Sequence, residues 1–206
     1  MNSPKPPPSD QALYALLRPQ RLTAVVDVGA NPIDGDTPYR SMLSGRHCTV
    51  TGFEPQANGL AFLNQRKSDL ETYLPYVIGD GSTQTLHLTA VPGMTSLFEP
   101  NFPVLDWFHG FSDWSAVQQK VPVQTHRLDD LAQVAAIDML KIDVQGAELM
   151  ALEGGVNRLR DVCVIQSEVS FIPLYMGQPL FSEIEIFLRR HGFMFHRFFP
   201  LSGRLL

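Results

Sequence analysis

The sequence predicts an open, doubly wound α/β domain built on a mostly parallel sheet. Short β-branched runs recur along the chain, and helix-length segments separate them. These runs are nearly continuous in hydrophobicity, which is typical of strands that helices cover on both faces. Their alternation with helices indicates a doubly wound sheet. The five runs are residues 24–28, 48–53, 76–79, 139–143 and 162–165.

Composition and length agree with a single globular domain. The chain has 206 residues, of which 44% are hydrophobic and 18% charged, and this excludes a disordered or fibrous protein. Its net charge of −5 argues against nucleic acid as a partner. The apolar runs are too short for a membrane span, and the start of the chain lacks an export signal, so we expect a cytoplasmic protein. Cys48 and Cys163 alone cannot build a disulfide framework or a zinc site.

The helices follow from capping residues and apolar periodicity. Residues 1–10 are rich in proline, so we expect a disordered tail there, and residues 11–206 should form the domain. Ser9 or Asp10 can cap a short first helix that stops at Pro19. Further helices are expected at 57–67, 147–158 and 180–191; the last has an apolar stripe and ends at Gly192.

A long interval between the third and fourth runs departs from this rhythm. Thr83 to Val91 alternates polar and apolar residues, which predicts an additional antiparallel strand. An aromatic insertion follows at about residues 94–121 and contains Trp107 and Trp114. Long aromatic connections are usually functional loops, although this one could also be an oligomer contact.

Acidic residues follow the predicted strands, where open α/β sheets bind their ligands. The turn from Asp27 to Asn31 contains Gly29, which permits close approach of a ligand, and Glu54 can accept both hydroxyls of a ribose. The other acidic strand ends are Asp80, Asp143 and Glu168. Each has a simpler explanation as a cap or turn residue, and Glu148 could merely complement a helix dipole. Together they favour a nucleoside ligand with a positive centre, because buried carboxylates need partners.

The segment Leu140 to Glu148, followed by Leu152 to Gly155, resembles the signature of the FkbM family of S-adenosylmethionine-dependent methyltransferases. The Asp27–Asn31 turn and the Gly52–Pro55 segment also fit this family, as do residues 127–131 and the strand before Glu168. The resemblance runs from about Thr23 to Phe195. It implies a Rossmann-like class I methyltransferase fold that methylates hydroxyl groups of sugars, glycans or natural products.

The resemblance also assigns the cofactor residues. It implies that the loop from Asp27 through Gly29 and Ala30 to Asn31 cradles the methionine part of S-adenosylmethionine. Glu54, next to Pro55, would hold the ribose, and Asp80 with Gly81 would lie near the adenine.

Two features depart from the family pattern. Members commonly have a second glycine shortly after the asparagine and a glutamate at the position of Gln145, whereas here the nearest glycine is displaced to Gly35. Class I methyltransferase sheets usually end in a hairpin. Here residues 193–199 supply one strand and a turn follows, so we expect an incomplete hairpin and an exposed strand edge that a second copy of the chain could cover.

For the reaction, Asp143 is the best candidate for the base or acceptor-orienting group, followed by Glu148 and Glu168. Glu148 could instead hold the Asp143 loop. Trp107 and Trp114 are the candidates for stacking on a glycan or small-molecule acceptor. No clustered motif supports a metal.

Two other functions compete with methyl transfer. One is a non-catalytic nucleotide-binding or scaffold protein. The other, an NAD-dependent dehydrogenase, is disfavoured because Gly-x-Gly-x-x-Gly is absent.

Overall fold

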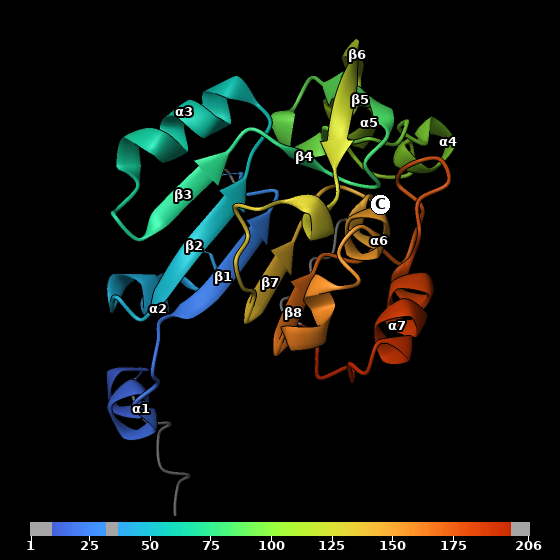
Figure 1. The fold of residues 1–206 in the computed structure, drawn as a ribbon. Helices are drawn as coiled ribbons and strands as arrows, with labels where there is room; N and C mark the ends of the chain where they lie inside the picture. Colours follow the sequence, from blue (N-terminus) through green and yellow to red (C-terminus); the bar gives the residue numbers. More distant parts are fainter. Residues whose placement is uncertain (1–9, 32–36, 199–206) are drawn as a thin grey trace, which may run out of the picture.

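The computed structural model describes residues 10–31 and 37–198, and its main parallel sheet confirms the predicted fold class. Within these residues the main sheet has five strands in the order β3-β2-β1-β7-β8, each parallel to its neighbours (Figure 1). They are β1 (Thr23–Val28), β2 (Cys48–Phe53), β3 (Glu71–Leu74), β7 (Met139–Ile142) and β8 (Val164–Ser167). The chain winds outward from β1 to β3 and then returns to β7 on the other side of β1. This reversal creates a crevice at the carboxyl ends of β1 and β7.

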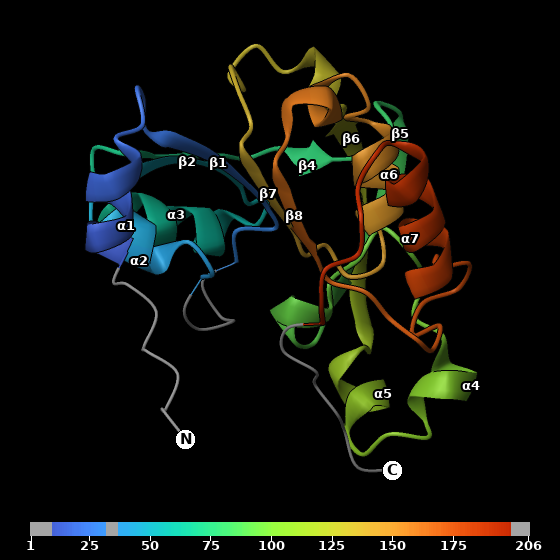
Figure 2. The same cartoon turned by 90° about the horizontal axis from the view of Figure 1, so that it is seen from below.

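Helices cover both faces of this sheet. Figure 2 shows α2 (Arg40–Ser44) and α3 (Ala57–Arg66) on one side, and α6 (Glu148–Glu153) and α7 (Phe181–Arg190) on the other. Successive side chains of a strand point to opposite faces. Val26 therefore packs in the core beside α6 and α7, while Val25 packs with Tyr39 near α2. Both valines are buried, which explains why β1 is apolar at successive positions.

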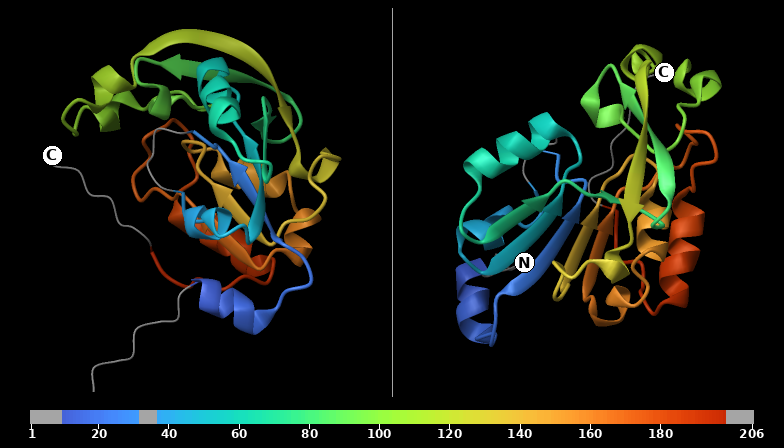
Figure 3. Two further views of the ribbon diagram at one scale, coloured as in Figure 1. Left: turned by 90° about the vertical axis from the view of Figure 1, so that its left-hand side faces the viewer. Right: turned by 45° about the horizontal axis from the view of Figure 1, so that its top comes forward.

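A second sheet lies beyond the carboxyl ends of the main strands (Figures 1 and 3). It consists of β4 (Val77–Ile78), β5 (Thr83–Thr89) and β6 (Val117–His126) in the order β4-β6-β5. β5 is antiparallel to β6, so the predicted antiparallel strand at 83–91 is confirmed. This sheet forms the other wall of the crevice.

The prediction for the third strand of the main sheet is wrong. Glu71–Leu74 pairs with β2, whereas Val77 and Ile78 pair with β6 in the second sheet. The β3 strand lies at the edge of the main sheet and carries polar residues, which hides it from a search for apolar runs. Ile78 is apolar because it belongs to the same buried core as Val26 and Leu152.

Other boundaries also differ from the predictions. The aromatic insertion contains the short helices α4 (Phe102–Leu105) and α5 (Phe111–Trp114), and its last residues belong to β6. Helix α6 ends at Glu153, before the predicted end at 158, and its C-cap Gly154 packs where a Cβ would come within 2.3 Å of the Gly79 carbonyl oxygen. Residues 193–198 form no strand, so this part of the predicted terminal strand is wrong.

The first helix is confirmed as α1 (Asp10–Leu17). The described residues do not include the proline-rich segment 1–9, Gly35 or residues 199–206, so what the sequence predicts for them stays a prediction. Among the helices of residues 10–31 and 37–198, none combines the length and hydropathy needed to cross a bilayer.

Candidate functional site

A cleft lies between the two sheets, at the carboxyl ends of β1, β2 and β7. Its main-sheet wall includes Gly29, Glu54 and Asp143, and its opposite wall includes Ile78 and Leu86. The cleft thus brings together Gly29, Glu54 and Asp143 from three of the predicted strand ends. Its full lining comprises Val28, Gly29, Asn31, Phe53, Glu54, Pro55, Gln56, Tyr76, Val77, Ile78, Leu86, Pro92, Gly93, Thr95, Ser96, Leu97, Asp143, Val144, Gln145 and Ala147.

The turn after β1 is built on Gly29. Its backbone has a φ of 81°, in the left-handed region that favours glycine, and its N–H donates to the Phe53 carbonyl at 3.1 Å. A Cβ at this position would come within 1.9 Å of the Asp143 carbonyl oxygen. The glycine therefore permits close packing of the β1 and β7 turns against each other as well as lining the cleft.

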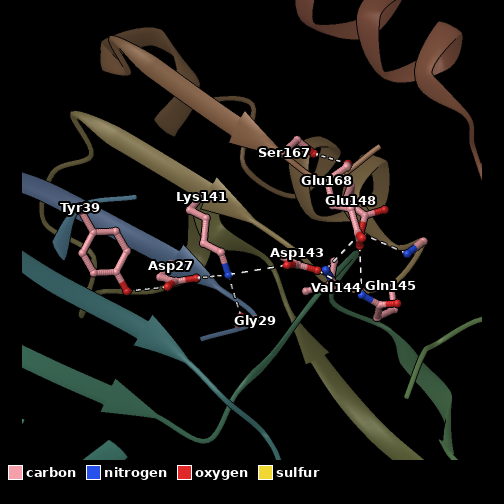
Figure 4. A network of polar contacts seen from close by, with 11 residues as sticks. Asp27, Gly29, Tyr39, Lys141, Asp143, Val144, Gln145, Glu148, Ser167 and Glu168 are labelled. Atoms are coloured by element: carbon pink, nitrogen blue, oxygen red, sulfur yellow. Dashed lines mark hydrogen bonds and ion pairs between the residues drawn. The ribbon is translucent and has the colours of Figure 1, made fainter. Parts of the chain in front are cut away.

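A buried ion pair joins these two turns beneath the cleft (Figure 4). Asp27 is fully buried, receives a hydrogen bond from the Tyr39 hydroxyl at 2.6 Å, and lies 3.1 Å from the Lys141 ammonium. Burial raises the pKa of Asp27, and Lys141 opposes that rise. Lys141 also donates to the Gly29 carbonyl oxygen at 3.0 Å. Asp27 does not line the cleft, so the pair supports the loop from Asp27 to Asn31 from behind.

Glu54 ends β2 as a buried carboxylate on the wall of the cleft. It is 2% exposed, and its Oε1 accepts the Gln56 backbone N–H at 2.7 Å. Burial raises its pKa, and the hydrogen bond from Gln56 partly counters this. A ligand with hydroxyl donors would satisfy the remaining acceptor capacity of this carboxylate.

Asp143 begins the turn between β7 and α6, and its side chain is held from two sides. Lys141 Nζ lies 4.0 Å from Asp143 Oδ2, and Gln145 Nε2 donates to Oδ1 at 3.1 Å. Glu148 lies behind this turn, 2% exposed, and accepts the backbone N–H groups of Val144 and Gly146 at 3.0 and 3.1 Å. Burial raises the pKa of Glu148. Of its two predicted roles, the geometry supports holding the loop; Glu148 does not line the cleft.

Glu168 follows β8 and is exposed just outside the cleft. Its Oε2 accepts a hydrogen bond from Gln145 Nε2 at 3.0 Å, which links it to Asp143 through one amide. Figure 4 shows Asp143, Gln145 and Glu168 close together at the end of the network that starts at Tyr39.

Several predicted site residues do not line the cleft. Asp80 accepts hydrogen bonds from the backbone and hydroxyl of Ser82, and these interactions lower its pKa. Asp80 and Gly81 thus form a turn before β5 outside the lining of the cleft, and their approach to the adenine stays a prediction. Ala30 is buried behind the wall of the cleft.

The aromatic candidates for acceptor binding also lie elsewhere. Trp107 is 60% exposed and Trp114 is 39% exposed, and neither lines the cleft. Trp114 instead packs on Phe111 within α5. Stacking of these tryptophans on an acceptor therefore stays a prediction, with no support from the lining of the cleft. The insertion contributes Thr95, Ser96 and Leu97 to the lining.

The sequence analysis did not predict several residues whose contacts support the turns around the cleft. Lys141 lies two residues before Asp143, and a charged residue so close to a predicted site carboxylate was a usable signal. Gln145, Ser96 and Tyr175 gave no comparable signal, because their hydrogen bonds join segments far apart in the chain. Tyr76, within the predicted run 76–79, and Gln56, just before the predicted helix 57–67, also line the cleft.

Known proteins with similar sequences show which family the chain belongs to. The chain is 25% identical over 181 residues to the 2-O-methyltransferase NoeI of Sinorhizobium fredii, an alignment that covers 79% of this chain and 70% of the relative. No solved structure is significantly similar to the chain. The profile of the methyltransferase FkbM domain matches residues 27–195, which run from Asp27 in β1 to beyond α7 and include the cleft and the turns that support it. The chain therefore belongs to the FkbM methyltransferase family, and it is a methyltransferase enzyme.

Proposed function

We propose that this enzyme transfers a methyl group from S-adenosylmethionine to a hydroxyl group of a sugar, glycan or small metabolite. The observation that carries the proposal is the cleft itself, which has the buried carboxylate of Glu54 on one part of its wall and the Asp143 carboxylate on another. It lies where open α/β sheets bind nucleoside ligands.

The residues of the cleft fit this methyl donor. Glu54 is placed to accept the ribose hydroxyls, because its carboxylate is buried and can only accept. Tyr76, Ile78 and Leu97 supply an apolar surface suited to a flat purine ring. Gly29 and Asn31 border the part of the cleft nearest Asp143, where the methionine portion would lie.

When bound, S-adenosylmethionine supplies an electrophilic methyl group on a positively charged sulfur. The protein must then orient the acceptor hydroxyl and remove its proton. Asp143 is the carboxylate for this task, because it lines the cleft and can accept a proton from a bound hydroxyl. Gln145 and Lys141 fix its orientation.

The choice of a hydroxyl acceptor has separate support. The relative from Sinorhizobium fredii is by name a 2-O-methyltransferase. In this chain the acceptor side of the cleft presents carboxylate, amide and hydroxyl groups, including those of Asp143, Gln145 and Ser96. Such groups form hydrogen bonds with polyols.

The test is methyl transfer from S-adenosylmethionine to a panel of methyl glycosides, followed by mass spectrometry of the products and of S-adenosylhomocysteine. The wild-type protein should methylate at least one glycoside, and Asp143→Asn should lower turnover by roughly a hundredfold or more, as expected for loss of a general base. Asp113→Asn, an exposed carboxylate of α5, is the matched control. Near wild-type turnover by folded Asp143→Asn would remove Asp143 from the reaction, and no binding of S-adenosylmethionine would overturn the proposal.

A further inference from the structure

Gln145 occupies the most constrained backbone position on the wall of the cleft. Its φ of 55° lies in the left-handed region, which is unfavourable for a residue with a long side chain. The Ser96 hydroxyl donates to its carbonyl oxygen at 2.6 Å, which ties the β7–α6 turn to the segment after β5. The backbone conformation directs the amide side chain toward Asp143 and Glu168, as Figure 4 shows.

Both the nitrogen and the oxygen of the Gln145 side-chain amide have hydrogen-bond partners. Nε2 has two hydrogens, and it donates to Asp143 Oδ1 at 3.1 Å and to Glu168 Oε2 at 3.0 Å. Oε1 lies 3.2 Å from the Tyr175 hydroxyl, whose one hydrogen it shares with the Met94 carbonyl oxygen at 3.1 Å. Burial raises the pKa of Tyr175 far above its usual range, so Tyr175 stays a hydroxyl donor. The amide is therefore oriented with its oxygen toward Tyr175 and its nitrogen between the two carboxylates.

The two carboxylates differ in their surroundings. Asp143 lines the cleft, whereas Glu168 is exposed beyond it. The other charged groups around this cluster are Lys141 of β7, on the far oxygen of Asp143, and Glu148 of α6, which faces the backbone of the turn. Between the two carboxylates the bridging donor is thus a neutral amide.

We propose that Gln145 is a positioning residue for the methyl acceptor: its amide holds Asp143 and Glu168 side by side, so that the acceptor hydroxyl meets one carboxylate inside the cleft and a neighbouring hydroxyl meets the other at its mouth. This proposal rests on the proposed function. It implies an acceptor with hydroxyls on adjacent positions, as in a sugar.

The first test needs no acceptor. Gln145→Glu replaces the donor with a third carboxyl group, whose ionisation the two neighbouring carboxylates oppose. Because the introduced carboxyl has a raised pKa in the folded state, the variant loses stability as the pH rises. The melting temperature of Gln145→Glu should fall below that of the wild type by at least about 3 °C more at pH 8 than at pH 5.

Two further variants control this measurement. Gln145→Met removes the donors without adding charge, so its difference from the wild type should grow less with pH. Gln133→Glu adds the same charge at an exposed position and should show almost no change in the difference. A difference for Gln145→Glu that is equal at pH 5 and pH 8 would overturn the proposed bridge.

The second test uses a methyl glycoside that the wild-type protein methylates. Gln145→Met should lower kcat/KM for the acceptor by roughly tenfold or more, as expected for lost hydrogen bonds to charged groups. The Kd for S-adenosylmethionine should stay within about threefold of wild type. Unchanged acceptor kinetics, or an equal loss of cofactor affinity, would overturn the positioning role. If no glycoside is methylated although S-adenosylmethionine binds, the proposed acceptor class fails, and the melting curves still decide whether Gln145 bridges the carboxylates.

Discussion

The buried pair of Asp27 and Lys141 should dominate the stability of the turns around the cleft. Asp27 has no exposed surface, and its polar partners in the described structure are the Tyr39 hydroxyl and the Lys141 ammonium. Lys141→Met would leave a buried carboxylate without its counter-ion. Loss of one partner of a buried pair costs about 3–5 kcal/mol, so we expect the free energy of unfolding at pH 7 to fall by that amount.

The assay is urea unfolding followed by far-UV circular dichroism, with a matched control on the surface. Lys120 and Glu99 form an exposed pair at 3.0 Å, and Lys120→Met should cost less than about 1 kcal/mol. The double variant Asp27→Asn/Lys141→Met should be more stable than Lys141→Met, because the unpaired charge is gone. Equal costs for Lys141→Met and Lys120→Met, or additive effects in the double variant, would refute this reasoning.

The same pair predicts a dependence on pH. Burial raises the pKa of Asp27, and removal of Lys141 would raise it further. A group with a raised folded-state pKa contributes stability below its unfolded pKa, near 3.9, and loses that contribution as the pH rises. The destabilisation of Lys141→Met should therefore be largest near neutral pH and shrink toward pH 4.

Three further predictions concern the walls of the cleft. Because burial raises the pKa of Glu54, Glu54→Gln should gain melting temperature relative to the wild type as the pH rises from 4 to 8, and a constant difference would argue against a strained carboxylate. Glu148→Ala removes the acceptor for two backbone N–H groups; it should cost about 2–4 kcal/mol in urea unfolding and speed hydrogen exchange at Val144 and Gly146, whereas unchanged exchange would show that other groups hold the turn. Trp107→Ala should leave methyl transfer within about twofold of wild type, since Trp107 lies outside the cleft, and a loss of tenfold would return it to the acceptor site.

The parts of the fold that the sequence predicted well are those with uniform surroundings. β1 and β2 lie inside the sheet between two other strands, so most of their residues are buried and apolar. β6 was missed because most of its residues are partly or fully exposed, its pattern is polar, and it contains Pro122. Its stability comes from pairing with β5, which lies about thirty residues earlier in the chain. Such long-range pairing leaves little local signal.

The site shows the same contrast between local and long-range determinants. Glu54 and Asp143 could be placed in one cleft because parallel strand ends meet at one edge of a sheet. Trp107 and Trp114 could not be placed, because their position depends on how two short helices fold within the insertion. The amide bridge of Gln145 depends on Tyr175 and Glu168, which lie more than twenty residues further along the chain. Its geometry emerges only from the assembled fold.

Binding of S-adenosylhomocysteine, measured by isothermal titration calorimetry, tests most directly whether the space between the two sheets holds the methyl donor. The wild-type protein should show saturable binding at one site, and Glu54→Ala should weaken it by roughly tenfold or more while Glu99→Ala, an exposed carboxylate outside the cleft, leaves it unchanged. Absence of binding heat and of any thermal shift with the wild-type protein, or equal binding by Glu54→Ala, would contradict this assignment.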